Sequence, residues 1–207
     1  MSNIEEIKLN DNITIHRSQY NWRYPKDILI NRVKQNLSHA SLSDFTTSNF
    51  VIQSKEINSL KSYCRDLAIQ VLGHTFDSLS NYVEQHWIYA SNRNTNINLG
   101  EAEIFHNHLI TITTSNSVPI PNIKTDISYC VYLNVPSDLN GEDGKLVFKD
   151  KNGEEVSILP RTGDILFFNP TYLHKPNFIH HSKEERIAVC SNLTINLSEY
   201  SEKKILI

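Results

Sequence analysis

The spacing of apolar residues changes near residue 86, and this change limits the fold more than any other feature. Before it, apolar positions recur with a helical period; after it, they alternate or form short runs bounded by turn residues. Because no helical segments separate the later runs, the sequence disfavours a doubly wound parallel sheet. We expect one mostly β domain, residues 1–207, with a helical part (1–85) packed on a β-barrel core (86–207).

Two segments of the N-terminal part carry clear helix signals. Residues 25–37 begin with a proline, which suits the first position of a helix. Residues 54–72 carry a continuous apolar stripe; Ser54 can cap the start, and Gly73 suits the left-handed residue that follows a helix end. A further short helix is expected at residues 78–85.

Short strands are expected in the remainder of the chain. Asn152-Gly153 is a strong signal for a tight hairpin between two of them. The polar stretch 115–125, with two prolines, is expected to be a loop that covers a site as a lid. The expected strands are 86–90, 104–114, 128–135, 145–149, 155–159, 164–169 and 186–196.

Composition and charge exclude several classes of protein. Lys and Arg total 20 and Asp and Glu total 23, so there is no basic footprint for nonspecific nucleic-acid binding. No apolar run approaches the roughly 18 residues of a membrane span. The cysteines, Cys64, Cys130 and Cys190, are too far apart for a disulfide framework. We expect a cytoplasmic protein that acts on a small molecule or peptide; a homo-oligomer is compatible with the sequence.

Three histidines form the most informative group of polar residues. His106 and His108 flank one residue in an expected strand, and residues two apart on a strand point to the same face. His174 follows a later expected strand, and antiparallel barrels bring such distant strands together. Three imidazoles favour iron, zinc, copper or nickel over magnesium or calcium. The sequence therefore predicts a metal site at these positions.

Several short motifs occur in an order that resembles the iron(II)- and 2-oxoglutarate-dependent oxygenases. Among these, the chain is most similar to the short prolyl-hydroxylase-like members found in bacteria and phages. His106 and His108 stand where that superfamily has His-x-Asp or His-x-Glu, and the resemblance covers roughly residues 86–196. The other motifs are 129–134 (YCVYLN), similar to "YLN"; 144–148 (GKLVF), similar to "GGxLxF"; and 160–168 (PRTGDILFF), similar to "PxxGxLxxF".

The resemblance implies a double-stranded β-helix barrel, also called a jelly roll or cupin-like fold. It also implies that His106, His108 and His174 are the catalytic metal ligands for Fe(II), with 2-oxoglutarate and O₂ as cosubstrates and ascorbate as an accessory reductant. Arg186 matches the arginine that binds 2-oxoglutarate, and Asn192 matches an asparagine of one subfamily. A planar guanidinium suits this role because it pairs with carboxylates through two parallel hydrogen bonds. The alternative for Arg186 is a structural salt bridge.

Two details of the site stay open at the level of sequence. Tyr129 or Tyr132 could donate a hydrogen bond to the cosubstrate, but in a regular strand only one of them faces inward. The family's acidic ligand is replaced by His108, so either this histidine is the ligand, or an acid such as Asp126 replaces it, or the protein binds metal without turnover.

The function implied is that of a dioxygenase that hydroxylates an unknown substrate and decarboxylates 2-oxoglutarate to succinate. The alternative is a cupin-like barrel that binds a metal or small ligand without 2-oxoglutarate turnover. Cupin sites take a Glu and two close His from one motif, and here Glu103 precedes the pair, which fits that order poorly. A third reading is a barrel that serves as a structural or interaction domain and has lost its metal.

Overall fold

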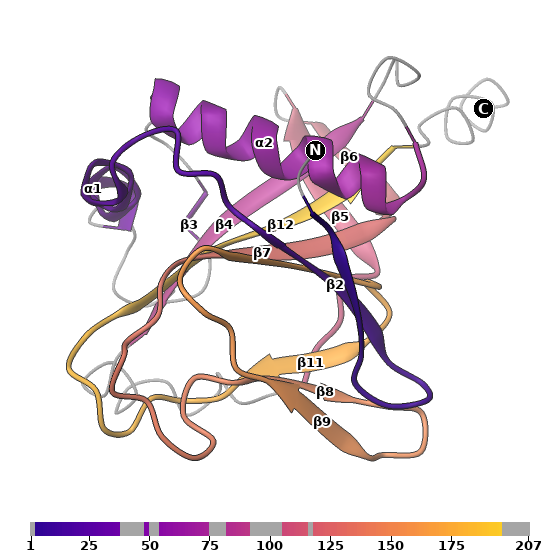
Figure 1. Cartoon of the computed structure of the whole chain (residues 1–207). Helices are drawn as coiled ribbons and strands as arrows, with labels where there is room; N and C mark the ends of the chain where they lie inside the picture. The colour runs from indigo at the N-terminus through magenta and orange to yellow at the C-terminus, as the bar shows by residue number, and fades with distance from the viewer. Residues whose placement is uncertain are drawn as a thin grey trace, which may run out of the picture.

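The protein consists of two antiparallel sheets that face each other, with helices on the outer side of the larger sheet (Figure 1). This arrangement is a double-stranded β-helix barrel, as the sequence predicted. The fold is seen in a computed structural model, which describes residues 3–37, 48–49, 54–74, 82–91, 105–115 and 118–195.

The larger sheet has seven strands within the described part of the chain, all paired antiparallel. Its central strands are buried along nearly their whole length, which explains why their sequences are almost continuously apolar. In spatial order the strands are β1 (Glu5–Lys8), β2 (Thr14–Gln19), β10 (Asp164–Phe168), β7 (Ile127–Asn134), β12 (Arg186–Thr194), β4 (Val83–Ser91) and β3 (Ser48–Asn49).

The smaller sheet consists of β11 (Leu173–Pro176), β8 (Leu146–Lys149) and β9 (Glu155–Ile158), in that spatial order. Its β8–β9 turn is held by the side chain of Asp150, which accepts backbone hydrogen bonds from Asn152 at 2.8 Å and Glu154 at 2.9 Å. Gly153 in this turn has a φ of 84°, a conformation that glycine adopts without strain. The predicted hairpin is therefore confirmed.

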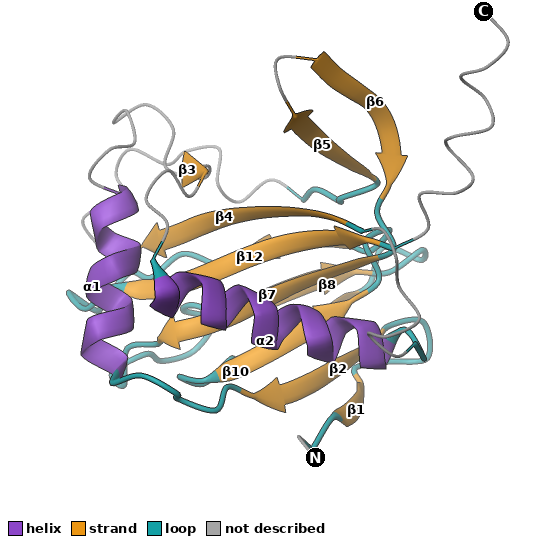
Figure 2. Cartoon of the chain, turned by 90° about the horizontal axis from the view of Figure 1, so that it is seen from above, coloured by secondary structure: helices purple, strands orange, loops and turns teal. Residues whose placement is uncertain are grey.

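A separate hairpin of β5 (Ile110–Ser115) and β6 (Val118–Lys124) projects from one end of the large sheet (Figure 2). The segment 115–125, expected to be a loop, is thus mostly strand. The expectation of a loop was wrong, because a strand at the edge of a sheet tolerates proline, and Pro119 lies opposite Thr114 in this hairpin.

Both predicted helices that fall on described residues are confirmed as α1 (Lys26–Leu37) and α2 (Lys55–Val71). The Ser54 hydroxyl accepts the N–H of Ile57 at 3.3 Å and caps α2. Both helices lie across the outer face of the large sheet (Figure 2). None of the helices in the described part of the chain is long and apolar enough to cross a lipid bilayer.

Side-chain alternation divides the large sheet into two apolar faces. The outer face packs against α2, and the inner face packs against the small sheet and forms the barrel interior. On β12, for example, Val189 faces the helices and Ala188 faces the interior. The interior residues include Tyr89, Cys130, Tyr132, Leu146, Phe148, Leu166, Phe168, Ala188 and Cys190.

The N-terminal part differs from the expected helical segment 1–85 in two ways. β1 and β2 precede the helices and extend the large sheet beyond β10. These short strands are rich in charged residues, so their alternation is weak in the sequence. Residues 83–85 of the predicted helix 78–85 belong to β4, where pairing with β12 overrides the local signal, and its residues 78–81 lie outside the described part.

A buried polar cluster lies on the outer face of the large sheet. The Tyr129 hydroxyl donates to Glu84 Oε1 at 2.9 Å, and His86 Nε2 lies 3.3 Å from the same hydroxyl. Burial raises the pKa of Glu84 to about 7, although the hydrogen bond from Tyr129 and the charge of Arg65 favour the ionised form. Glu84 is therefore protonated more readily in the folded protein than in the unfolded chain.

This shift predicts that stability depends on pH through Glu84. The pKa of Glu84 in the folded state exceeds the ordinary value of 4.5. The stabilisation that Glu84 contributes to the folded state is therefore fully present below pH 4.5 and is lost as the pH rises through about 7. Glu84→Gln should remove this dependence, which amounts to on the order of 3 kcal/mol. Urea denaturation of both proteins across this pH range measures it. Glu154→Gln, at an exposed position, is the control and should follow wild type; parallel curves for Glu84→Gln and wild type would contradict the prediction.

Candidate metal centre

Backbone pairing brings the three predicted histidines together. His106 and His174 form an isolated antiparallel bridge: the amide of His106 donates to the carbonyl of His174 at 3.1 Å, and the amide of His174 donates back at 2.9 Å. The amide of His108 donates to the carbonyl of Pro170 at 2.9 Å. These bonds tie residues 106–108, just before β5, to both ends of the turn that leads into β11.

The imidazoles converge on one point. The ring centroids are 4.5 Å apart for His106 and His174, 4.9 Å for His108 and His174, and 5.1 Å for His106 and His108. One ring nitrogen from each lies within 4.8 Å of the others, a separation that one ion can bridge. His106 is exposed, His108 is half-buried and His174 is buried. The cluster therefore lies where the barrel opens to solvent.

The surroundings keep two of these rings neutral. Burial, together with the neighbouring His108 and His106, lowers the pKa of His174 to about 3. Burial and His106 likewise lower the pKa of His108 to about 4. The Nδ1 of His174 lies 3.0 Å from the carbonyl of Tyr172, so Nδ1 carries the proton and Nε2 keeps its lone pair. Neutral imidazoles with free lone pairs are what a metal ion requires.

Aromatic side chains from both sheets hold the rings in place. Trp87 of β4 packs on His108 with ring centroids 5.1 Å apart. Phe168 of β10 packs on His174 at 4.7 Å, and Phe148 of β8 lies 6.1 Å from the same ring. A metal-ligand set held this way is positioned before any ion binds.

Arg186 lies on the inner face of β12 and is 1% exposed. Its Nη1 donates to the carbonyl of Gly144 at 2.7 Å, its Nη2 donates to Ser91 Oγ at 3.3 Å, and its Cζ lies 5.0 Å from the ring centroid of Tyr89. Among the described residues, no carboxylate oxygen lies within 4.0 Å of the guanidinium, and its buried Nε has no hydrogen-bond partner. The structural salt bridge considered for this arginine is therefore absent from the described part.

A tightly fastened loop supplies the carbonyl that binds Arg186. Gly144 has a φ of 68°, and a Cβ there would lie 2.7 Å from Leu139 Cδ1, so the loop needs glycine. Next to it, Asp143 contacts Nδ1 of His180 at 3.0 Å and of His181 at 2.9 Å. Burial acts to raise the pKa of Asp143, but the hydrogen bonds from His181 and His180 prevail and lower it to about 2. The ionised carboxylate thus anchors the loop beside the arginine.

The structure distinguishes the two candidate tyrosines. Tyr132 is buried in the barrel interior, opposite Ala188 of β12 and close enough to Arg186 for the guanidinium to influence its pKa. Tyr129 faces the helices and binds Glu84, so the prediction that it binds a cofactor is wrong. Only one of the two faces inward, as strand alternation requires.

Asn192 lies on β12 and is 2% exposed. Its Oδ1 accepts a hydrogen bond from Ser128 Oγ at 2.8 Å, so it is fixed by its neighbour on β7. In β12 the side chains of alternate residues share a face, which places Asn192 on the same side as Arg186.

Asp126, the alternative acidic ligand, does not join the histidines. Its Oδ2 accepts the amide of Ile195 at 2.8 Å, and no carboxylate of the described residues belongs to the cluster. Glu103, which a cupin-type site would use, lies outside the described residues. No pattern in the sequence predicts Ser91, Gly144 or Tyr89 as neighbours of Arg186, because these residues are far from it in the chain and meet it only in the folded structure.

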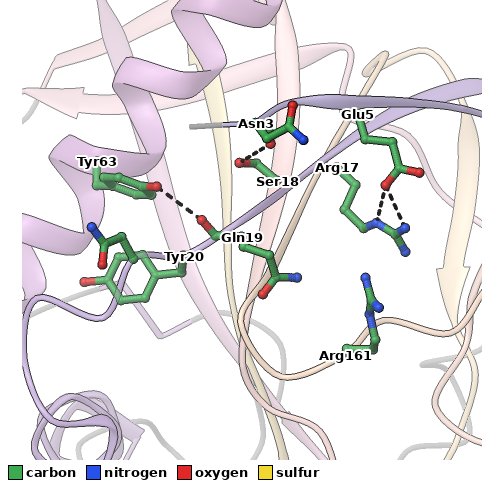
Figure 3. A pocket seen from close by; sticks show the side chains of 9 residues that line it. Asn3, Glu5, Arg17, Ser18, Gln19, Tyr20, Tyr63 and Arg161 are labelled. Carbon is green, nitrogen blue, oxygen red and sulfur yellow. Dashed lines mark hydrogen bonds and ion pairs between the residues drawn. The ribbon is translucent and has the colours of Figure 1, made fainter. Parts of the chain in front are cut away.

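A second pocket, of about 560 Å³, lies at the β1–β2 edge of the large sheet (Figure 3). Its two arginines already have acidic partners. Arg17 binds Glu5 Oε2 through Nε at 3.1 Å and Nη2 at 2.7 Å, and Nε of Arg161 lies 3.6 Å from Asp164. None of the described residues that line it is a histidine or a cysteine. The matched charges contrast with the isolated guanidinium of Arg186.

Comparison with known proteins identifies the fold by structure. The sequence matches no family model, and no curated protein matches it. The non-heme alpha-ketoglutarate-dependent epimerase SnoN from nogalamycin biosynthesis superposes with a TM-score of 0.54 and 14% identity over 82% of this chain and 72% of SnoN. EvdMO1 superposes with a TM-score of 0.55 and 11% identity over 88% of this chain and 47% of EvdMO1.

A prolyl-4-hydroxylase from Pseudomonas putida is also similar, with a TM-score of 0.48 and 14% identity over 85% of this chain and 83% of the hydroxylase. The double-stranded β-helix fold is confirmed.

The cluster predicts that each histidine contributes to binding a divalent transition metal. Replacing His106, His108 or His174 by Ala should weaken Fe(II) affinity by about 100-fold or more, since altering even outer partners of metal ligands costs about 10–100-fold. Anaerobic titration calorimetry measures this. His16→Ala and Asp126→Asn are matched controls outside the cluster and should bind Fe(II) as wild type does. If Asp126→Asn lost the metal and His108→Ala kept it, the three-histidine set would be refuted.

Proposed function

We propose that this protein is an Fe(II)- and 2-oxoglutarate-dependent oxygenase that hydroxylates a C–H bond of a small-molecule or peptide substrate. The observation that carries the proposal is the guanidinium of Arg186, which is buried in the same barrel as the three-imidazole cluster and lacks a carboxylate partner in the described part of the chain. A buried charge without a counterion destabilises a protein by several kcal/mol, so an anionic ligand is expected to lie there.

The electrostatics of the site favour a dianion. The three histidines contribute no negative charge, and a divalent ion bound to them would add two positive charges to that of Arg186. A dicarboxylate offers one carboxylate to the metal and one to the guanidinium, so each of these two positive groups would have an anionic partner. 2-Oxoglutarate has this form, and its keto group gives it a second donor for the metal.

Each residue then has a defined task. His106, His108 and His174 would hold Fe(II), and Arg186, whose buried Nε has no hydrogen-bond partner among the described residues, would bind the far carboxylate of the cosubstrate. Gly144 and Ser91 fix the guanidinium, and apolar neighbours exclude water from it. Tyr132 forms part of the wall beside Arg186, and Asn192, fixed by Ser128, stands further along the same strand.

When bound, Fe(II) and 2-oxoglutarate supply oxidative chemistry in which O₂, 2-oxoglutarate and substrate C–H become succinate, CO₂ and substrate C–OH. The alternative of a cupin-like binding protein requires no ligand for Arg186. A barrel evolved only to hold a metal gains nothing from a buried, uncompensated guanidinium, which is why we favour the oxygenase.

Succinate formation tests the proposal directly. Wild-type protein with Fe(II), ascorbate, 2-oxoglutarate and air should release succinate in excess of a protein-free mixture, and His174→Ala should abolish the excess. Anaerobic binding of 2-oxoglutarate is measured alongside and should depend on metal. Metal binding without any metal-dependent binding of 2-oxoglutarate would support the cupin alternative and exclude the oxygenase.

Arg186→Met separates cosubstrate binding from folding. The methionine fills similar space without charge, so the variant should be at least as stable as wild type in the absence of ligand. In wild type already loaded with Fe(II), 2-oxoglutarate at 100 times its Kd should add about 2.7 kcal/mol of further stability, and this further gain should disappear in the Fe(II)-loaded variant. Anaerobic thermal unfolding measures both. Arg161→Met, at an exposed site, is the control; an undiminished gain in Arg186→Met would remove Arg186 from its role.

A further inference from the structure

Two cysteines from neighbouring strands meet inside the barrel. Cys130 of β7 and Cys190 of β12 are directly opposite each other in the antiparallel register. Their sulfur atoms are 3.2 Å apart, with Cys130 donating a hydrogen bond to Cys190. Both are free thiols and both belong to the interior apolar cluster. Two thiols in contact on paired strands have the arrangement that a disulfide needs without a large backbone movement.

The pair is more accessible than the remaining cysteine. Cys130 and Cys190 are each 8% exposed, whereas Cys64 is 1% exposed and packs between α2 and the opposite face of the sheet. A small oxidant that enters the barrel can therefore reach the first two and not the third. Cys64 serves as an internal reference for the reactivity of a fully buried thiol.

The pair also lies between the two parts of the proposed cosubstrate site. Cys190 is on the same strand and face as Arg186, and the guanidinium influences the pKa of Cys130. Across β4, Cys190 is opposite Trp87, whose ring packs on His108. The thiols thus form part of the barrel wall that runs from the guanidinium towards the histidines.

We propose that Cys130 and Cys190 are a redox-sensitive pair, which peroxide converts to an intramolecular disulfide inside the barrel and which thiols restore. In the first step, one cysteine loses its proton and attacks peroxide as the thiolate; the O–O bond breaks, sulfenic acid forms, and the leaving hydroxide takes up that proton as water. In the second, the other cysteine attacks that sulfur; the S–S bond forms, the S–O bond breaks, and a second water leaves. The two thiols lose two electrons and peroxide gains them.

The contact between the sulfurs decides the product. A sulfenic acid formed on either residue meets the other thiol at once, so the disulfide forms before further oxidation to sulfinic acid. The hydrogen bond with Cys190 and burial raise the pKa of Cys130 well above its ordinary value, whereas Arg186 acts to lower it. The resting pair is consequently a dithiol that needs a strong oxidant.

The test counts thiols after oxidation of the native protein. Purified protein is treated with hydrogen peroxide or with diamide, an azo compound that accepts the same two electrons, and is then denatured with an alkylating reagent and weighed by mass spectrometry. Of the three cysteines, one should be alkylated after oxidation, and all three after later treatment with dithiothreitol. Cys64→Ser should give no alkylated cysteine after oxidation, and Cys190→Ala should form no intramolecular disulfide.

Alkylation of all three cysteines after oxidation, or a disulfide that includes Cys64, would overturn the inference. A second arm repeats the diamide reaction with Ni(II) and 2-oxoglutarate bound, a step that rests on the proposed function. Slower oxidation of the pair in that arm supports both proposals. An unchanged rate supports the redox pair and counts against a cosubstrate site beside it, so the two failures are distinguishable.

Discussion

The alternation of side chains along β12 is the constraint on which the remaining structure depends. This strand is buried on both faces and pairs with β7 on one side and β4 on the other. One set of its side chains packs under the helices, and the other set, which includes Arg186, points into the barrel. A shift of one residue in register would exchange the two sets, so the apolar packing that fixes the register also fixes the site.

Arg186 differs from other charged residues of the protein because, in the described part of the chain, no carboxylate balances its positive charge. Acidic partners match the exposed arginines at the β1–β2 edge, and Asp143 is matched by two histidines. Arg186 has no such partner among the described residues, and no carboxylate of those residues belongs to the histidine cluster. The three histidines carry no negative charge, so in the proposed function the anionic cosubstrate would supply it.

The histidine cluster could be predicted from the sequence, because two histidines two residues apart and a third after a later strand need only antiparallel pairing to meet. Which face of β7 points into the barrel could not be predicted, since apolar residues lie on both faces of this strand. For the same reason the sequence does not distinguish Tyr129 from Tyr132 until the positions of the helices are known. The residues that contact the guanidinium of Arg186 come from two separate segments, and no local pattern in the sequence predicts these contacts. The two segments are β4, with Tyr89 and Ser91, and the loop with Gly144. The strands β1 and β2 could not be predicted, because their charged residues obscure the alternation of apolar and polar positions.

The most direct measurement is anomalous diffraction at the iron edge from crystals grown anaerobically with Fe(II) and 2-oxoglutarate. The account predicts one anomalous peak within bonding distance of a nitrogen of His106, His108 and His174, and density for a dicarboxylate that extends from the metal to the guanidinium of Arg186. An ion bound elsewhere, or a guanidinium without a ligand while the metal is present, would contradict it.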